Sequence, residues 1–99
     1  MISNPFNTTA AVAAGESLAK IVIESVPLTA KGTDLKHAKK VSSSMRKMAQ
    51  HIEWVKLQHR FNFFQKAKLG TILQWKLKDA GYETTYTKEL TEWVLMRLK

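Results

Sequence analysis

One segment, residues 34–60, reads DLKHAKKVSSSMRKMAQHIEWVKLQHR and shapes the expectations for the whole chain. Its apolar residues recur at intervals of three and four, which places them on one side of an α-helix. Asp34 suits the start of such a helix, because a carboxylate is favourable near the positive end of the helix dipole. The pattern predicts one long amphipathic helix over about residues 34–60. Its apolar positions are Ala38, Val41, Met45, Met48, Ile52 and Val55.

A narrow apolar stripe of this kind needs a partner helix to cover it. We therefore expect five of these residues to form an interface, and we name them the apolar seam: Val41, Met45, Met48, Ile52 and Val55. A homodimer built on this seam is one arrangement that would satisfy it.

The opposite side of the same segment is basic. It carries five cations with no acidic residue among them: Lys36, Lys39, Lys40, Arg46 and Lys47. Cations at helical spacing are sufficient to contact phosphates, and phosphate neutralisation supplies most non-specific affinity for nucleic acid. The alternative is a solvated face that only keeps the protein in solution.

Composition favours a small folded domain. The chain has 99 residues, 44% of them hydrophobic, and it has no cysteine and a formal net charge of +8. We expect a single domain over residues 1–99, with residues 1–7 as a flexible N-terminal end. Residues 31–60 hold a net charge of +6, so the positive field is concentrated on the long segment and favours encounter with a polyanion.

Three further helices are predicted, over about residues 8–26, 63–80 and 86–98. Pro27 ends the first, and Gly81 is suited to the left-handed closing position of the second. Between residues 54 and 64 either the long helix continues, or it breaks near residue 60 and restarts with Asn62 and Gln65 as a capping box. We favour the break. No convincing strand pattern is present, so the fold class is all-α, an irregular bundle of about four helices.

Two local features leave alternatives open. Gly15 permits close approach to another backbone or simple fraying of the helix start. Phe64, Lys68, Trp75 and Lys78 form an aromatic and basic strip on the predicted helix 63–80. Such a strip can stack exposed bases, although aromatic residues at helical spacing more often serve a core or a subunit contact.

No pattern indicates catalysis. The chain lacks a glycine-rich phosphate loop, a cysteine nucleophile and a carboxylate pair on an apolar face, so we do not expect an enzyme or a cofactor. His37, His51 and His59 lack the three- or four-residue spacing that lets two imidazoles share a metal ion, so no metal site is expected.

These features predict a non-catalytic basic protein that binds DNA or RNA with low sequence specificity. The residues expected to carry the contacts are Lys36, Lys39, Lys40, Arg46, Lys47, Lys68, Trp75 and Lys78. The alternative is a helical protein–protein interaction module, such as an adaptor, an assembly subunit or an inhibitor, with an acidic protein as partner. A homo-oligomer is compatible with both hypotheses. We expect a cytoplasmic location and no membrane partner, because no apolar run is long enough to span a bilayer.

Overall fold

The computed structural model describes residues 7–31 and 43–99, which form four α-helices and no strand. The expectation of an all-α bundle is confirmed for these residues. The helices are α1 (Thr9–Ser25), α3 (Ser43–Gln58), α4 (Phe63–Ala80) and α5 (Thr84–Arg97). Three of them begin and end within two residues of the predicted positions. The first part of the expected long helix, residues 34–42, lies outside the described residues, as do residues 1–6.

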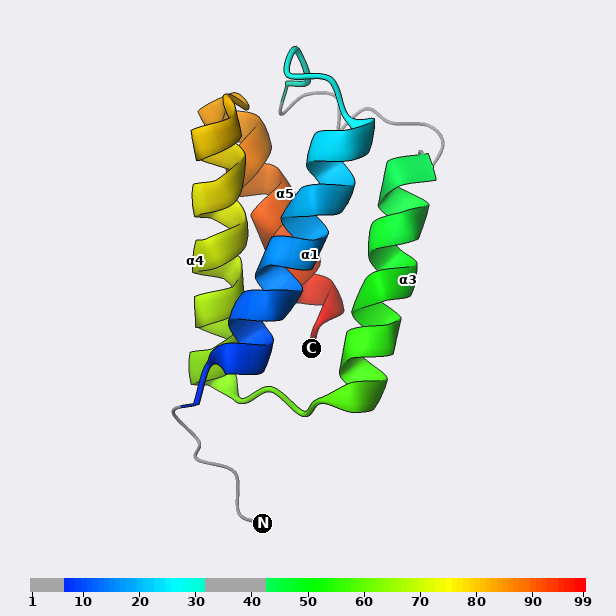
Figure 1. Ribbon diagram of the computed structural model, residues 1–99, viewed down its shortest axis with the longest axis vertical. Helices are drawn as coiled ribbons and strands as arrows, with labels where there is room; N and C mark the ends of the chain where they lie inside the picture. Colours follow the sequence, from blue (N-terminus) through cyan, green and yellow to red (C-terminus); the bar gives the residue numbers. More distant parts are fainter. Residues whose placement is uncertain (1–6, 32–42) are drawn as a thin grey trace.

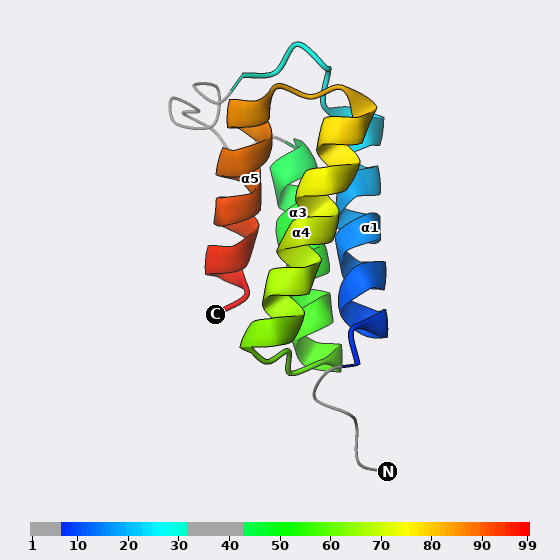
Figure 2. The ribbon, with the colours of Figure 1, turned by 90° about the vertical axis from the view of Figure 1, so that its left-hand side faces the viewer.

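The helices alternate in direction: α1 and α4 run one way, and α3 and α5 run the other (Figure 1). Helix α1 contacts α3 and α4, and α5 also contacts α3 and α4. Among the described residues, the backbones of α3 and α4 do not approach each other closely, nor do those of α1 and α5, so consecutive helices α3 and α4 occupy opposite corners of the bundle. The turn at residues 59–62 therefore crosses the end of the bundle (Figures 1 and 2).

The break between α3 and α4 is stabilised by the capping box that the sequence suggested. The Gln65 backbone N–H donates to the Asn62 side chain at 2.8 Å, and the Asn62 backbone N–H donates to Gln65 Oε1 at 2.9 Å. Gln65 Nε2 also donates to the backbone oxygen of Asn7 at 2.9 Å, which ties the start of α1 to the start of α4. The helix therefore ends before residue 60 and restarts, and the continuous-helix alternative is wrong.

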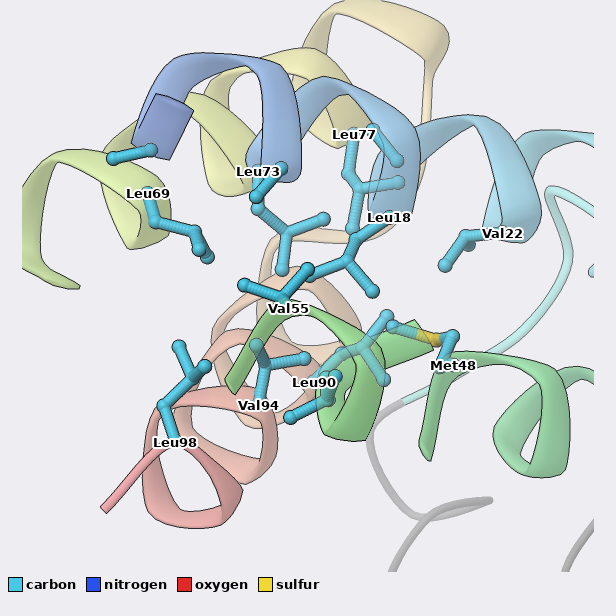
Figure 3. Packing of buried hydrophobic residues seen from close by; sticks show 14 of the residues in the cluster. Leu18, Val22, Met48, Val55, Leu69, Leu73, Leu77, Leu90, Val94 and Leu98 are labelled. Carbon is cyan, nitrogen blue, oxygen red and sulfur yellow. The ribbon is translucent and has the colours of Figure 1, made fainter. Parts of the chain in front are cut away.

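The core is a cluster of leucines, valines and other apolar side chains contributed by all four helices (Figure 3). Met48, Ile52 and Val55 of the apolar seam are completely or almost completely buried in this cluster. Helices α1 and α5 of the same chain pack against α3, so these three side chains already have an intramolecular partner. Met45 is half-buried, and Val41 lies outside the described residues.

The most extensive helix contact is between α1 and α4, and it includes a close backbone approach at Gly15. A Cβ atom at Gly15 would lie 2.9 Å from the backbone oxygen of Leu69 and 3.1 Å from Ile72 Cβ. Backbone atoms cannot move aside as a flexible side chain can. Of the two sequence-based interpretations of Gly15, close approach is the correct one.

The other end of α1 is held by a buried tyrosine. The Tyr82 hydroxyl donates to the backbone oxygen of Val26 at 2.6 Å and also lies within hydrogen-bond distance, 3.0 Å, of the backbone oxygen of Val22. The last carbonyls of a helix have no partner within the helix, so this hydroxyl satisfies the C-terminal end of α1 from the segment between α4 and α5. The nearby Gly81, with φ of 107°, ends α4 in the predicted left-handed conformation.

The two mid-helix glycines make a matched test of the α1–α4 contact. We expect Gly15→Ala to lower the free energy of unfolding by roughly 1–2 kcal/mol, because overpacking against a backbone exceeds the gain in helix propensity. Gly70→Ala would meet only side-chain atoms, Leu95 Cδ1 at 3.2 Å and Thr91 Cγ2 at 3.5 Å, and should be neutral or stabilising by up to about 1 kcal/mol. Urea unfolding followed by circular dichroism measures both, and equal effects would contradict the close backbone approach.

Tyr82→Phe should cost about 1–2 kcal/mol of unfolding free energy, because the part-buried carbonyl of Val26 loses this donor while the ring remains. Ser25→Ala is the control at the same end of α1: it removes an exposed hydroxyl that donates to the Ile21 backbone oxygen, and it should change stability by less than about 0.5 kcal/mol. Thermal unfolding of the two variants distinguishes them, and a Tyr82→Phe protein as stable as the parent would refute the role of the hydroxyl.

Candidate nucleic-acid interface

The structure places only part of the predicted basic face. Arg46 and Lys47 are exposed on the first half of α3, as the sequence pattern requires. Lys36, Lys39 and Lys40 lie outside the described residues. The predicted face is therefore represented by two of its five cations.

The aromatic and basic strip lies elsewhere on the molecule. Phe64, Lys68, Trp75 and Lys78 are all exposed and line the outward side of α4, with Trp75 60% exposed. Since α3 and α4 occupy opposite corners of the bundle, the structure does not bring Lys68, Trp75 and Lys78 together with Arg46 and Lys47. The residues predicted to bind nucleic acid thus divide between two separate faces.

A cationic pocket that the sequence analysis did not identify lies where the 59–62 turn passes the end of α5. We name it the turn pocket; its volume is about 490 Å³. Buried Val55 and Leu98, with half-buried Phe61, form its apolar part. The remaining lining residues are cations and one histidine: Lys56, His59, Arg60, Lys66 and Lys99.

The charge of the turn pocket is unbalanced. None of the described residues that line it is acidic. Lys56 forms an ion pair with Glu53 at 3.8 Å, but both side chains are substantially exposed, and such surface pairs contribute little. Four cationic residues line one cavity, so an anion would be attracted to it.

A second basic pocket lies further along the junction between α3 and α5. Its volume is about 400 Å³, and its lining includes Arg46 from α3 and Arg97 and Trp93 from α5. The Arg97 guanidinium lies 5.1 Å from the centre of the Trp93 ring, a cation–π contact that orients this arginine. We call the cations of the two pockets together the cationic flank: Arg46, Lys56, Arg60, Lys66, Arg97 and Lys99.

Only Arg46 of the cationic flank was among the predicted binding residues. The other cations of the flank come from α3, the 59–62 turn, α4, and the last residue of α5 with the end of the chain after it. They line neighbouring pockets because the turn crosses the bundle and places Lys66 on the side where α5 ends. The one available signal was the basic run at the helix break, His59 and Arg60 followed by Lys66 and Lys68.

The histidines do not form a metal centre in the part of the chain that the structure describes, where no group of three or more histidine, aspartate or glutamate side chains is placed to hold an ion. His37 lies outside that part. His59 is exposed and stacks on Phe61, with ring centres 5.3 Å apart. His51 is half-buried, stacks on Trp54 at 5.7 Å, and its Nε2 is buried without a hydrogen-bond partner among the described residues. Desolvation by burial lowers the pKa of His51 below its usual 6.5.

Because the pKa of His51 is lowered, the free energy of unfolding should fall as the pH is lowered below 6.5. Between the lowered folded pKa and 6.5, the unfolded chain binds a proton that the folded chain does not, so unfolding becomes easier as pH falls below 6.5. Urea unfolding at several pH values should show this loss, and His51→Gln should reduce it. His59→Gln, which removes an exposed imidazole, is the control. A parent and a His51→Gln variant with the same pH profile would contradict the assignment.

Comparisons with known proteins give no assignment to set beside this geometry. No protein-family model matches the chain, and no curated protein or solved structure is significantly similar to it. None of the helices formed by residues 7–31 and 43–99 has the length and hydropathy of a membrane-spanning helix.

Proposed function

We propose that this protein is a non-catalytic nucleic-acid-binding protein that holds DNA or RNA through phosphate contacts along the cationic flank. The single observation that supports the proposal most strongly is the turn pocket, which gathers four cations and no acidic residue among its lining side chains. Exposed Lys47, next to Arg46, adds to the same field. A cytoplasmic location is part of the proposal.

The form of the flank suits a chain of phosphates better than an isolated anion. Its two pockets follow each other along the α3–α5 junction, with Arg46 and Arg97 at one and Lys56, Arg60 and Lys66 at the other. A polyanion that follows this junction would neutralise cations in both pockets and release counterions from several phosphates at once. Lysine and arginine both contact phosphates through their charge, and such contacts carry no sequence information, so the flank fits low sequence specificity.

A salt titration tests the proposal. Binding of a fluorescent oligonucleotide should weaken steeply with salt, and the triple variant Lys56→Gln, Arg60→Gln, Lys66→Gln should reduce the slope of log affinity against log salt by roughly 2 units, since each lost phosphate contact removes about 0.7–0.9. Fluorescence anisotropy at several salt concentrations gives the slope.

The matched control is the triple variant Lys20→Gln, Lys31→Gln, Lys88→Gln, which loses the same three charges from exposed positions outside the flank. It should retain most of the parent slope. A third set, Lys39→Gln, Lys40→Gln, Lys47→Gln, measures the contribution of the predicted face on the long segment. If the flank and control variants lose equally large parts of the salt slope, binding depends on net charge and not on the cationic flank. If the parent protein binds no strand at low salt, the proposal is refuted.

A second candidate function is a helical protein–protein interaction module. The observation that favours it is the outward side of α4, where Phe64 and Trp75 are more than half exposed and Lys68 and Lys78 flank them. Exposed aromatic residues of this size often mark a docking surface, and the lysines would suit an acidic partner or an assembly subunit. Light scattering tests this candidate. A homo-oligomer that dissociates in the Trp75→Ala variant would support an interaction module, and a strict monomer that binds no acidic protein would refute it.

A further inference from the structure

A third pocket adjoins the turn pocket, and its character is different. It is about 380 Å³ in volume, and it is lined by Phe63, Ala67 and Leu95 together with Lys66 and Lys99. We name it the apolar pocket. Lys66 and Lys99 also line the turn pocket, so the two cavities are neighbours that share these lysines. Each volume is within the roughly 300–1,000 Å³ of sites that hold small molecules.

Phe63 gives the apolar pocket an exposed aromatic ring. It is the first residue of α4, and its side chain is 87% exposed, so the ring is accessible to a ligand. The backbone that carries it is fixed by the Asn62–Gln65 capping box immediately before and after it. A ring presented from a rigid helix start beside two lysines is well placed to stack on a flat ligand that also carries negative charge.

We propose that the turn pocket and the apolar pocket together bind one unpaired nucleotide of a nucleic-acid strand. The base lies against Phe63 in the apolar pocket, and an adjoining phosphate lies in the turn pocket, with Lys66 between them. The inference rests on the proposed function and deepens it, because it names the strand form that the flank accepts.

Duplex nucleic acid cannot satisfy this arrangement without cost. In a duplex the faces of the bases are stacked on their neighbours, so placing one in the apolar pocket would require unstacking and unpairing, at a few kcal/mol. A single strand offers its bases without that cost, and base–aromatic stacking tolerates any base. The protein should therefore prefer single strands to duplexes of equal charge, with little sequence preference.

The test separates base contacts from phosphate contacts. The probes are a short fluorescent oligothymidylate and an abasic strand of the same length, which carries the same phosphates without bases. The parent protein should bind the oligothymidylate roughly 5- to 150-fold more tightly than the abasic strand, the range that stacking of one base supplies. Phe63→Ala should bring the oligothymidylate affinity down to that of the abasic strand and leave the abasic affinity unchanged, while Phe63→Leu should recover only part of the difference.

Leu57→Ala is the matched control, because Leu57 is 84% exposed on α3 and lines neither pocket. It should not change either affinity, and circular dichroism confirms that each variant remains folded. If the parent binds both strands equally, or if Phe63→Ala weakens both equally, the inference is wrong although the proposed function stands. If the parent binds neither strand at low salt, both fail. Phe63-dependent binding to phosphatidylserine vesicles, without discrimination between the strands, would assign the apolar pocket to an acyl chain and overturn the inference.

Discussion

The arrangement of this bundle depends on the capping box between Asn62 and Gln65. Those two reciprocal hydrogen bonds start α4 afresh immediately after α3 has ended, so the chain changes direction within residues 59–62. The turn crosses to the opposite corner of the bundle, and α1 and α5 then fill the two positions between α3 and α4. The same turn brings His59, Arg60 and Lys66 to the end of α5, so the capping box fixes the start of α4 at the place where the turn pocket forms.

Packing inside the bundle explains why the cations remain at the surface. The seam residues Met48, Ile52 and Val55 are buried within the chain, each contributing about 1.5–3 kcal/mol by leaving water, and α3 is thereby held with one side inward. Its other sides, which carry Arg46, Lys47 and Lys56, must then face solvent. The hydrophobic contacts and the exposed charges of α3 are two results of the same amphipathic pattern.

Short-range sequence patterns predicted the helices and their ends, but they did not predict which residues from distant parts of the chain come together. Gly81, Asn62 and Gln65 act through hydrogen bonds with near neighbours, so helix ends could be expected from the residues alone. The meeting of Lys66 with Lys56 and Lys99 depends on which corners the helices occupy, and no periodicity encodes that. For the same reason the pattern showed that the seam needed a partner but did not identify α1 and α5, and it did not distinguish half-buried His51 from exposed His59.

The close contact of α1 with α4 also has a consequence for how the protein folds. These helices are parallel neighbours that are far apart in sequence, and the hydrogen bond from Gln65 to Asn7 spans 58 positions. The chain must lose the entropy of closing that long loop before its most extensive helix pair forms, whereas contacts between consecutive helices close shorter loops. This topology raises the contact order and favours slower folding than is usual for a helical protein of this length.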